Sequence, residues 1–297
     1  MSNFDDLFSD KQEKAEKSAS HTFNKEEWIA KKQKERTAAF DILKEATEEA
    51  KQDGEKFRDY LNVQSRFDRY SVSNALMVAH QNPNAVKLAD FDTWKDNDIF
   101  ITKGAKAITI LEPGNEYTRE DGTTGFSVNA KKVFDISQTS EAESYIAPPK
   151  QNERTVMKAL IASAPCDIRM TDEVSKDVCA EYKANENVIY VRQGLDGNDM
   201  FRSLAQEIAS AKLAKSGEKS DVKFISYCSA FILCERNGFD NGSFNFDGIG
   251  KYAENIDGKA FRSKLDKVRD TANEMTQEMS RSIEEQQKAK RSREEAR

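Results

Sequence analysis

Apolar positions recur every three or four residues along much of the chain, and this spacing predicts helices. The first helix is expected over residues 25–52. Asn24, followed three residues later by Glu27, is typical of a helix start, because the asparagine side chain caps backbone N–H groups. Gly54 interrupts the helix, and a second helical segment runs through Leu61. The apolar face of the first helix consists of Ala39, Ile42, Leu43, Ala46 and Ala50.

A third helix is predicted next. Either Ser71 or Ser73 is placed to cap it, the helix runs to Gln81, and Pro83 stops it.

The spacing then changes from helical to alternating, which predicts strands. Residues 99–113 alternate as a β-hairpin does, with Lys103 and Gly104 at the turn. A polar excursion over residues 114–125 leads into a further strand at residues 126–137. Helices followed by a small antiparallel sheet indicate an α+β arrangement for this half.

Helical spacing dominates the second half of the chain. A linker with paired prolines precedes it at residues 139–151, and Asn237-Gly238 marks a helix stop. The expected helices are residues 152–164, 198–215 and 219–236, and the expected strand pair is residues 166–171 with 187–194.

Residues 259–297 form one long, highly charged helical pattern with a narrow apolar stripe. Two interpretations stay open, a seam for a coiled coil or a protein partner, and a solvated helix that frays. The stripe consists of Leu265, Val268, Ala272, Met275, Met279 and Ile283.

Composition predicts a disordered N-terminal segment and a soluble, cytoplasmic protein. Charged residues make up 33% of the chain and hydrophobic ones 37%, a polar balance. Residues 1–23 are acidic and lack sustained periodicity, so we expect disorder there. No apolar stretch approaches the roughly 20 residues that span a bilayer, and the N-terminus has no apolar signal region. We therefore expect a cytoplasmic protein without a membrane partner.

Cysteine and histidine usage disfavours a built metal site. The four cysteines form no CxxC pair, and their spacing matches no zinc ribbon or finger. The two histidines, His21 and His80, lie in a polar lead and on a helix. A net charge of −6 argues against a generally basic nucleic-acid coat and leaves room for a local basic face.

One helix nevertheless has the frame of a zinc-protease helix. In 203-SLAQEIASAKLA-214, Gln206 and Ser210 stand four residues apart on one face, where a zincin carries two histidines. Glu207 stands where the general base stands. Glutamine and serine are poor zinc ligands, so the spacing is right and the ligand chemistry is absent.

Several segments resemble the ArdC-type antirestriction proteins and their LtrC-like relatives on conjugative elements. The resemblance covers roughly residues 25–250 and implies an N-terminal single-stranded-DNA-binding domain followed by a zincin-like metallopeptidase domain. The motifs that carry it are 67-FDRYSVSNALMVAHQNP-83, Trp94, 103-KGAKAITILEP-113, 132-KVFDISQT-139, 202-RSLAQEIASAKLA-214 and 221-DVKFISYCSAFILCERNGFD-240.

The resemblance also implies a metal site that can be checked position by position. Its two histidine positions fall on Gln206 and Ser210, its glutamate is kept as Glu207, and its third ligand falls on Lys223, with Asp221 the nearest acidic residue. We therefore expect a pseudo-metallopeptidase without a cofactor. Either Lys223 forms an ion pair with Glu207 in place of the metal, or both side chains reach solvent.

The first half supplies candidate DNA contacts. Single-stranded DNA is held by basic groups along the phosphates and by aromatic faces on which bases stack. Such side chains are also common in cores and on solvated surfaces, and acidic neighbours such as Asp92 and Asp96 weaken a basic patch. The candidates are Arg66, Arg69, Tyr70, Asn74, Trp94, Lys103, Lys106 and Lys132.

Together these observations predict an α+β protein with four ordered or semi-ordered parts after the lead. We expect a single-stranded-DNA-binding accessory protein of a mobile element, acting in antirestriction or strand protection. The alternative is a protein-interaction scaffold that uses the pseudo-peptidase domain and the C-terminal helix; a live metallopeptidase is the third reading. The expected parts are an ArdC-type domain at residues 24–138, a linker at 139–151, a degenerate zincin-like domain at 152–255 and a charged helical tail at 256–297.

Overall fold

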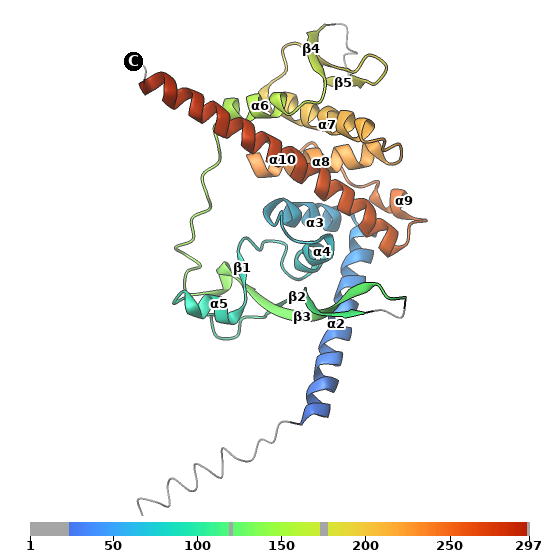
Figure 1. The fold of residues 1–297 in the computed structure, drawn as a ribbon, viewed down its shortest axis with the longest axis vertical. Helices are drawn as coiled ribbons and strands as arrows, with labels where there is room; N and C mark the ends of the chain where they lie inside the picture. Colours follow the sequence, from blue (N-terminus) through green and yellow to red (C-terminus); the bar gives the residue numbers. More distant parts are fainter. Residues whose placement is uncertain (1–23, 119–120, 173–177, 296–297) are drawn as a thin grey trace, which may run out of the picture.

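The computed structural model describes residues 24–118, 121–172 and 178–295 (Figure 1). The expected disordered lead at residues 1–23 lies outside the described residues. The helices are α2 (Lys25–Gln52), α3 (Gly54–Arg66), α4 (Val72–Gln81), α5 (Phe91–Asp96), the 3₁₀ turn η1 (Ile136–Gln138), α6 (Glu153–Ala162), α7 (Gly197–Lys215), α8 (Val222–Asn237), α9 (Ile249–Ala253) and α10 (Gly258–Glu295). The strands are β1 (Leu88–Ala89), β2 (Ile108–Thr118), β3 (Thr124–Asp135), β4 (Asp167–Thr171), β5 (Ala180–Lys183) and β6 (Val188–Arg192).

Local capping signals set the helix ends as the sequence predicts. The Asn24 side chain accepts the backbone N–H groups of residues 26 and 27 at the start of α2. Ser71, rather than Ser73, caps α4 through the N–H of Asn74. Gly238 ends α8 with φ 80°, a left-handed conformation that suits glycine.

The first sheet differs from the predicted hairpin at residues 99–113. Its order is β1-β3-β2, all antiparallel, and β2 pairs with β3 over nearly their whole length. A turn does form at Lys103-Gly104, with Gly104 at φ 88°, but Ile101 makes only an isolated bridge to Thr139. The predicted 99–113 hairpin is therefore wrong, because residues 108–113 pair with the longer partner that follows them in sequence.

The second sheet is small and has the order β4-β6-β5. β4 and β6 pair in parallel, which confirms the expected strand pair. β5 runs antiparallel to β6 and was not predicted, since its four residues, AEYK, carry no clear alternation.

The apolar stripe of α10 is buried within the chain itself. Leu265, Val268, Ala272 and Met275 are fully buried and Met279 is 3% exposed. α10 packs on α8 and α6 and also reaches α2 and α4, so it crosses the whole body (Figure 1). Both interpretations of this stripe, a free partner seam and a fraying solvated helix, are wrong for residues 265–279, because the chain supplies its own partner surface.

One hydrophobic core joins the two halves of the chain. It contains buried residues from α2, α3 and α4 together with residues from α6, α7, α8 and α10. At its centre the Phe57 ring of α3 lies 5.9 Å from Phe224, 5.3 Å from Phe246 and 6.1 Å from Phe261, all from the second half. A Cβ at Gly54 would lie 2.9 Å from backbone atoms of Phe246, so the start of α3 packs backbone to backbone there.

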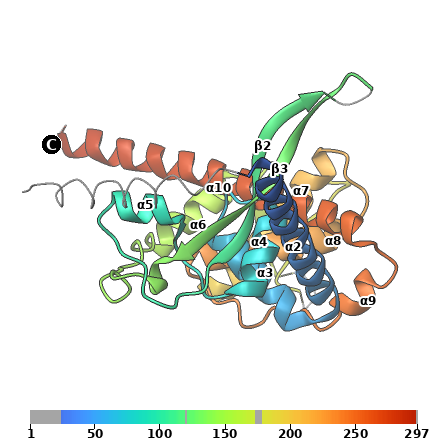
Figure 2. The ribbon, with the colours of Figure 1, turned by 90° about the horizontal axis from the view of Figure 1, so that it is seen from below.

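Beyond this core the β2–β3 hairpin projects from the body as an arm, and α2 crosses the hairpin (Figure 1, Figure 2). Within the described ranges, none of the helices combines the length and the apolar character that crossing a bilayer requires.

Candidate functional site

A groove rich in lysine lies between α2 and the β2–β3 hairpin. It encloses about 660 Å³. Two glutamates, Glu35 and Glu112, also line it. We call it the lysine groove. Its basic side chains are Lys31, Lys32 and Lys34 from α2 and Lys131 and Lys132 from β3, and its apolar lining includes Ala38, Ala39, Ile42 and Ala130.

The helix geometry explains why these lysines face the hairpin. Lys31 and Lys34 precede Ala38 by seven and four residues, so they continue the stripe of α2 that packs against the sheet. Farther along α2, Ala39 and Leu43 are buried with Leu111 and Ala130 of the hairpin beside them. The packed end of α2 therefore fixes the position of the basic end.

Charge pairing leaves the lysine groove positive. Lys32 pairs with Glu35 at 3.0 Å. Lys131 lies 2.8 Å from Asp90 and 3.4 Å from Glu112, and its hydrogen bond holds the pKa of Asp90 well below the usual range.

Among the described residues, the remaining lysines of the groove have no carboxylate partner. Lys132 donates to the Thr109 hydroxyl at 2.6 Å. Lys31 and Lys34 make no ion pair within the part of the chain that the structure describes. Three lysines are thus free to meet an anion such as a phosphate.

Trp94 does not offer a face for base stacking. It is 2% exposed, and its indole N–H donates to the Phe134 carbonyl at 3.0 Å. The Lys87 ammonium lies 5.5 Å from the ring centroid. The proposed role of Trp94 as a DNA contact is therefore wrong, because this ring belongs to the interior beneath β3.

Asn74 is committed to the sheet. Its amide donates to the Leu111 carbonyl and accepts from the Leu111 N–H, both at 2.8 Å. Gln81, two turns along α4, makes the same pair of 2.8 Å bonds with Thr109. These two amides occupy the free edge of β2, so the Asn74 side chain is held against the backbone of the sheet.

The predicted arginine and tyrosine contacts lie away from the lysine groove. The Arg66 guanidinium donates to the carbonyls of Asn62, at 3.2 Å, and Pro83. Arg69 and Tyr70 line a separate cavity of about 470 Å³ against α10, where Asn273 donates to the Asp68 carbonyl at 3.0 Å.

Lys103 and Lys106 are exposed at their turn, which is anchored where Gln138 donates to the Lys106 carbonyl at 2.8 Å. Of the eight predicted DNA residues only Lys132 lies in the lysine groove. Sequence reasoning missed Lys31, Lys32 and Lys34, although the run KKQK on α2 was a visible signal.

The zinc-protease frame on α7 carries no ligand geometry. The Ser210 hydroxyl donates to the Gln206 carbonyl at 3.1 Å, a bond within the helix. The Glu207 carboxylate accepts the Tyr182 N–H of β5 at 2.9 Å and meets the Gln206 amide at 3.5 Å. These side chains are engaged with their own helix and with the neighbouring strand.

Glu207 is a half-buried acid. Burial raises its pKa, the Tyr182 N–H bond opposes that shift, and the nearby Glu181 adds to it. Lys223 is exposed at the start of α8 and contributes nothing to this shift. The proposed Glu207–Lys223 ion pair is therefore wrong. Lys223 reaches solvent, as the alternative expected, whereas Glu207 is half-buried and bonded to β5.

Asp221 is equally occupied. It forms an ion pair with Lys264 of α10 and accepts the Tyr252 hydroxyl at 2.9 Å. Across residues 24–118, 121–172 and 178–295 no three His, Cys, Asp or Glu side chains are grouped so that they could hold a metal ion. A metal at the frame on α7 does not fit the residues that are there.

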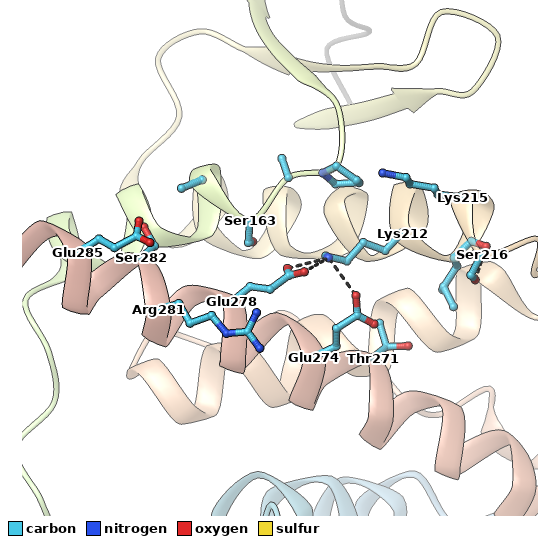
Figure 3. Close-up of a pocket in the computed structure, with 14 residues that line it drawn as sticks. Ser163, Lys212, Lys215, Ser216, Thr271, Glu274, Glu278, Arg281, Ser282 and Glu285 are labelled. Carbon is cyan, nitrogen blue, oxygen red and sulfur yellow. Dashed lines mark hydrogen bonds and ion pairs between the residues drawn. The ribbon is translucent and has the colours of Figure 1, made fainter.

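A second cavity of about 660 Å³ lies where the ends of α6 and α7 meet the middle of α10 (Figure 3). Lys212, only 11% exposed, points between Glu274 and Glu278 at 3.2 and 2.7 Å (Figure 3). Lys215 and Arg281 add two positive charges and Glu285 adds one negative charge, which makes three of each sign. Positive and negative groups balance here, so we interpret the ion pairs in this cavity as an internal link between α7 and α10.

Comparison with known proteins places the architecture. Two crystal structures of the antirestriction protein ArdC from plasmid R388, one metal-free and one bound to Mn(II), superpose with a TM-score of 0.52 each. Each alignment covers 71% of this chain, and it covers 86% and 85% of the two ArdC chains, at 16% and 18% identity. The chain has the ArdC-type fold. No family model and no curated protein sequence matches it.

The ArdC-type fold agrees with the α+β arrangement expected from the sequence, in which helices and a small antiparallel sheet precede a mostly helical second half. Within this fold the lysine groove and the α7 frame lie on different elements, α2 with the hairpin and α7 with β5. Any chemistry of one is therefore separable from the other by mutation.

Proposed function

We propose that this chain is a single-stranded-DNA-binding accessory protein of a mobile or conjugative element, with an antirestriction or strand-protecting role. The observation that carries the proposal is the lysine groove. Five lysines and two glutamates line this channel between a helix and a hairpin. Such a channel can follow the phosphates of one strand, and the ArdC-type fold supports the antirestriction context.

We also propose that the chain is not a peptidase. The positions of the α7 frame hold an amide and a hydroxyl, and Glu207 is held by a backbone N–H of β5. A metal that binds only the folded state stabilises it, by an amount that grows with the logarithm of its affinity. Added Mn(II), Zn(II) or EDTA should therefore leave the melting temperature unchanged, and a metal-dependent rise together with casein cleavage would contradict the proposal.

Fluorescence anisotropy on the full chain tests the DNA role, with labelled single-stranded and duplex DNA at rising salt. The variant K31Q/K34Q/K132Q removes the three lysines without carboxylate partners. For a single strand, each phosphate contact contributes about −0.7 to the slope of log K against log salt, so the slope should become shallower by about 2. Affinity for the single strand should fall at least tenfold.

A matched control makes the same charge change elsewhere, at the exposed lysines of K219Q/K251Q/K259Q. It should keep the wild-type slope. An equal loss in both triple variants would mean that net charge, rather than the groove, governs binding. Absence of binding to any DNA at low salt would favour the alternative, a protein-interaction scaffold.

A further inference from the structure

Two aromatic side chains on the projecting arm are exposed. Phe126 of β3 is 61% exposed and Tyr117 of β2 is 49% exposed. The arm leaves the body next to the lysine groove, since Glu112, Ala130 and Lys131 belong to both (Figure 2). Large exposed rings beside a basic channel are the second ingredient of a single-strand site, because every base has a face that can stack.

The strand register places Phe126 on the groove side of the arm. Side chains alternate along a strand, so Phe126 shares a face with Ala130 and Lys132. The register shift of the hairpin falls between Pro113 and Glu116 of β2, so β3 keeps its alternation.

Tyr117 lies on the opposite face. It pairs with Gly125, the neighbour of Phe126. The two rings are therefore similar in exposure and differ in the face that carries them.

The spacing suits one continuous path. Six residues separate Phe126 from Lys132, about 20 Å along an extended strand. A strand whose phosphates lie against Lys31, Lys34 and Lys132 has only to continue along the arm to bring a base to the Phe126 ring.

We propose that Phe126 is a base-stacking site for single-stranded DNA that leaves the lysine groove along the arm. This inference rests on the proposed function and assigns the stacking role to a residue of the arm. The interior position of Trp94 removes the aromatic contact expected from the sequence. Duplex DNA keeps its bases stacked on each other, so the ring discriminates in favour of the single strand.

Anisotropy with the full chain tests the stacking role by comparing F126A with Y117A. Stacking of one base on one ring is worth a factor of about 5 to 150 in affinity for single strands. F126A should lose that factor and keep the wild-type salt slope, since no phosphate contact is removed. Y117A, on the other face, should bind within about twofold of wild type.

A direct readout uses F126W. Its added fluorescence, taken as the difference from wild type, should be quenched by single-stranded oligonucleotide and not by duplex. An equal loss in F126A and Y117A, or an unquenched F126W at saturating single strand, would overturn the inference. If wild type binds single strands and only K31Q/K34Q/K132Q loses them, the proposed function stands and the stacking site fails. If wild type binds none, the proposed function fails first.

Discussion

The Glu207 carboxyl group destabilises the folded chain when it is ionised. It is half-buried between α7 and β5, its pKa is raised by burial, and it accepts a hydrogen bond from the Tyr182 N–H at 2.9 Å. No cation faces it within the described ranges. Its ionised form is therefore less stable in the folded chain than in the unfolded chain.

The sign of the resulting pH dependence follows from that shift. The folded chain holds the Glu207 proton more tightly than the unfolded chain does. In the unfolded chain the pKa of this carboxyl is the ordinary value, near 4.5. Between the two pKa values the native state binds more protons, so the free energy of unfolding falls as pH rises through this interval.

E207Q should remove this dependence, because the glutamine oxygen can still accept the Tyr182 N–H and carries no charge. Urea unfolding should show E207Q to be more stable than wild type at about pH 8, with the difference vanishing near about pH 4. The exposed-site variant E254Q serves as control and should follow wild type throughout. A wild type that gains stability relative to E207Q as pH rises would contradict the burial account.

Among the elements, the contact of α4 with β2 is the least expected. β2 is an edge strand of its sheet, and an unprotected edge invites pairing with other chains. α4 covers it with two amide side chains, Asn74 and Gln81, which bond Leu111 and Thr109 as a neighbouring strand would. A helix thus closes the sheet without adding a strand.

N74A should destabilise the chain by about 1–3 kcal/mol, because it leaves the N–H and carbonyl of Leu111 without partners. Chemical unfolding measures the loss. Its single-strand affinity, measured well below the unfolding transition, should stay at the wild-type level. The neighbour variant S73A controls for a change at a half-buried position in the first turn of the same helix. A loss of DNA affinity without loss of stability would instead give Asn74 a direct contact.

Elements whose causes are local could be predicted from the sequence. The cap at Asn24, the stop at Gly238 and the 3.6-residue spacing of α2, α7 and α8 involve neighbours within one or two turns. The partner of β2 required a choice between residues 99–102 and 124–135, which local spacing does not decide.

The candidate site could not be predicted from the sequence, because it is formed by residues that lie even farther apart along the chain. Lys31 and Lys34 meet Lys132 across about a hundred residues of sequence, so only the folded chain shows the lysine groove. Trp94 illustrates the opposite case, because nothing near it in sequence reveals the Phe134 carbonyl that its indole reaches. The same holds for Glu207 and β5, since β5 itself carried no signal.

At the scale of the whole molecule, α8 and α10 together hold the two halves of the chain in contact. The buried side chains of α10 lie in the same core as those of α2, α3 and α4. Phe261 near its start contacts the Phe57 cluster, and Arg236 of α8 donates to Thr276 at 2.9 Å and to the Ser65 carbonyl at 3.1 Å. The segment expected to be a tail is thus a structural part of both halves.

Two truncations measure this role. Removal of residues 258–297 should abolish cooperative unfolding, because it strips a full row of side chains from the core. Removal of residues 287–297 only, beyond the buried stripe, should change stability by about 1 kcal/mol or less. M275A should have an effect between those of the two truncations, a decrease of about 2–5 kcal/mol in the free energy of unfolding. A chain without residues 258–297 that still melts cooperatively would show that the rest of the core folds without α10.

The shared core also governs the order of events during synthesis. Residues 24–138 leave the ribosome well before Met279, yet the surface of α3 and α4 is covered only when α8 and α10 arrive. At about 5–20 residues per second, the interval is of the order of ten seconds. During that time a nascent chain exposes Phe57 and its neighbours, which makes it a substrate for chaperones. Fusions or early stop codons that delay or remove α10 should therefore lower the yield of protein more than its stability in isolation would suggest.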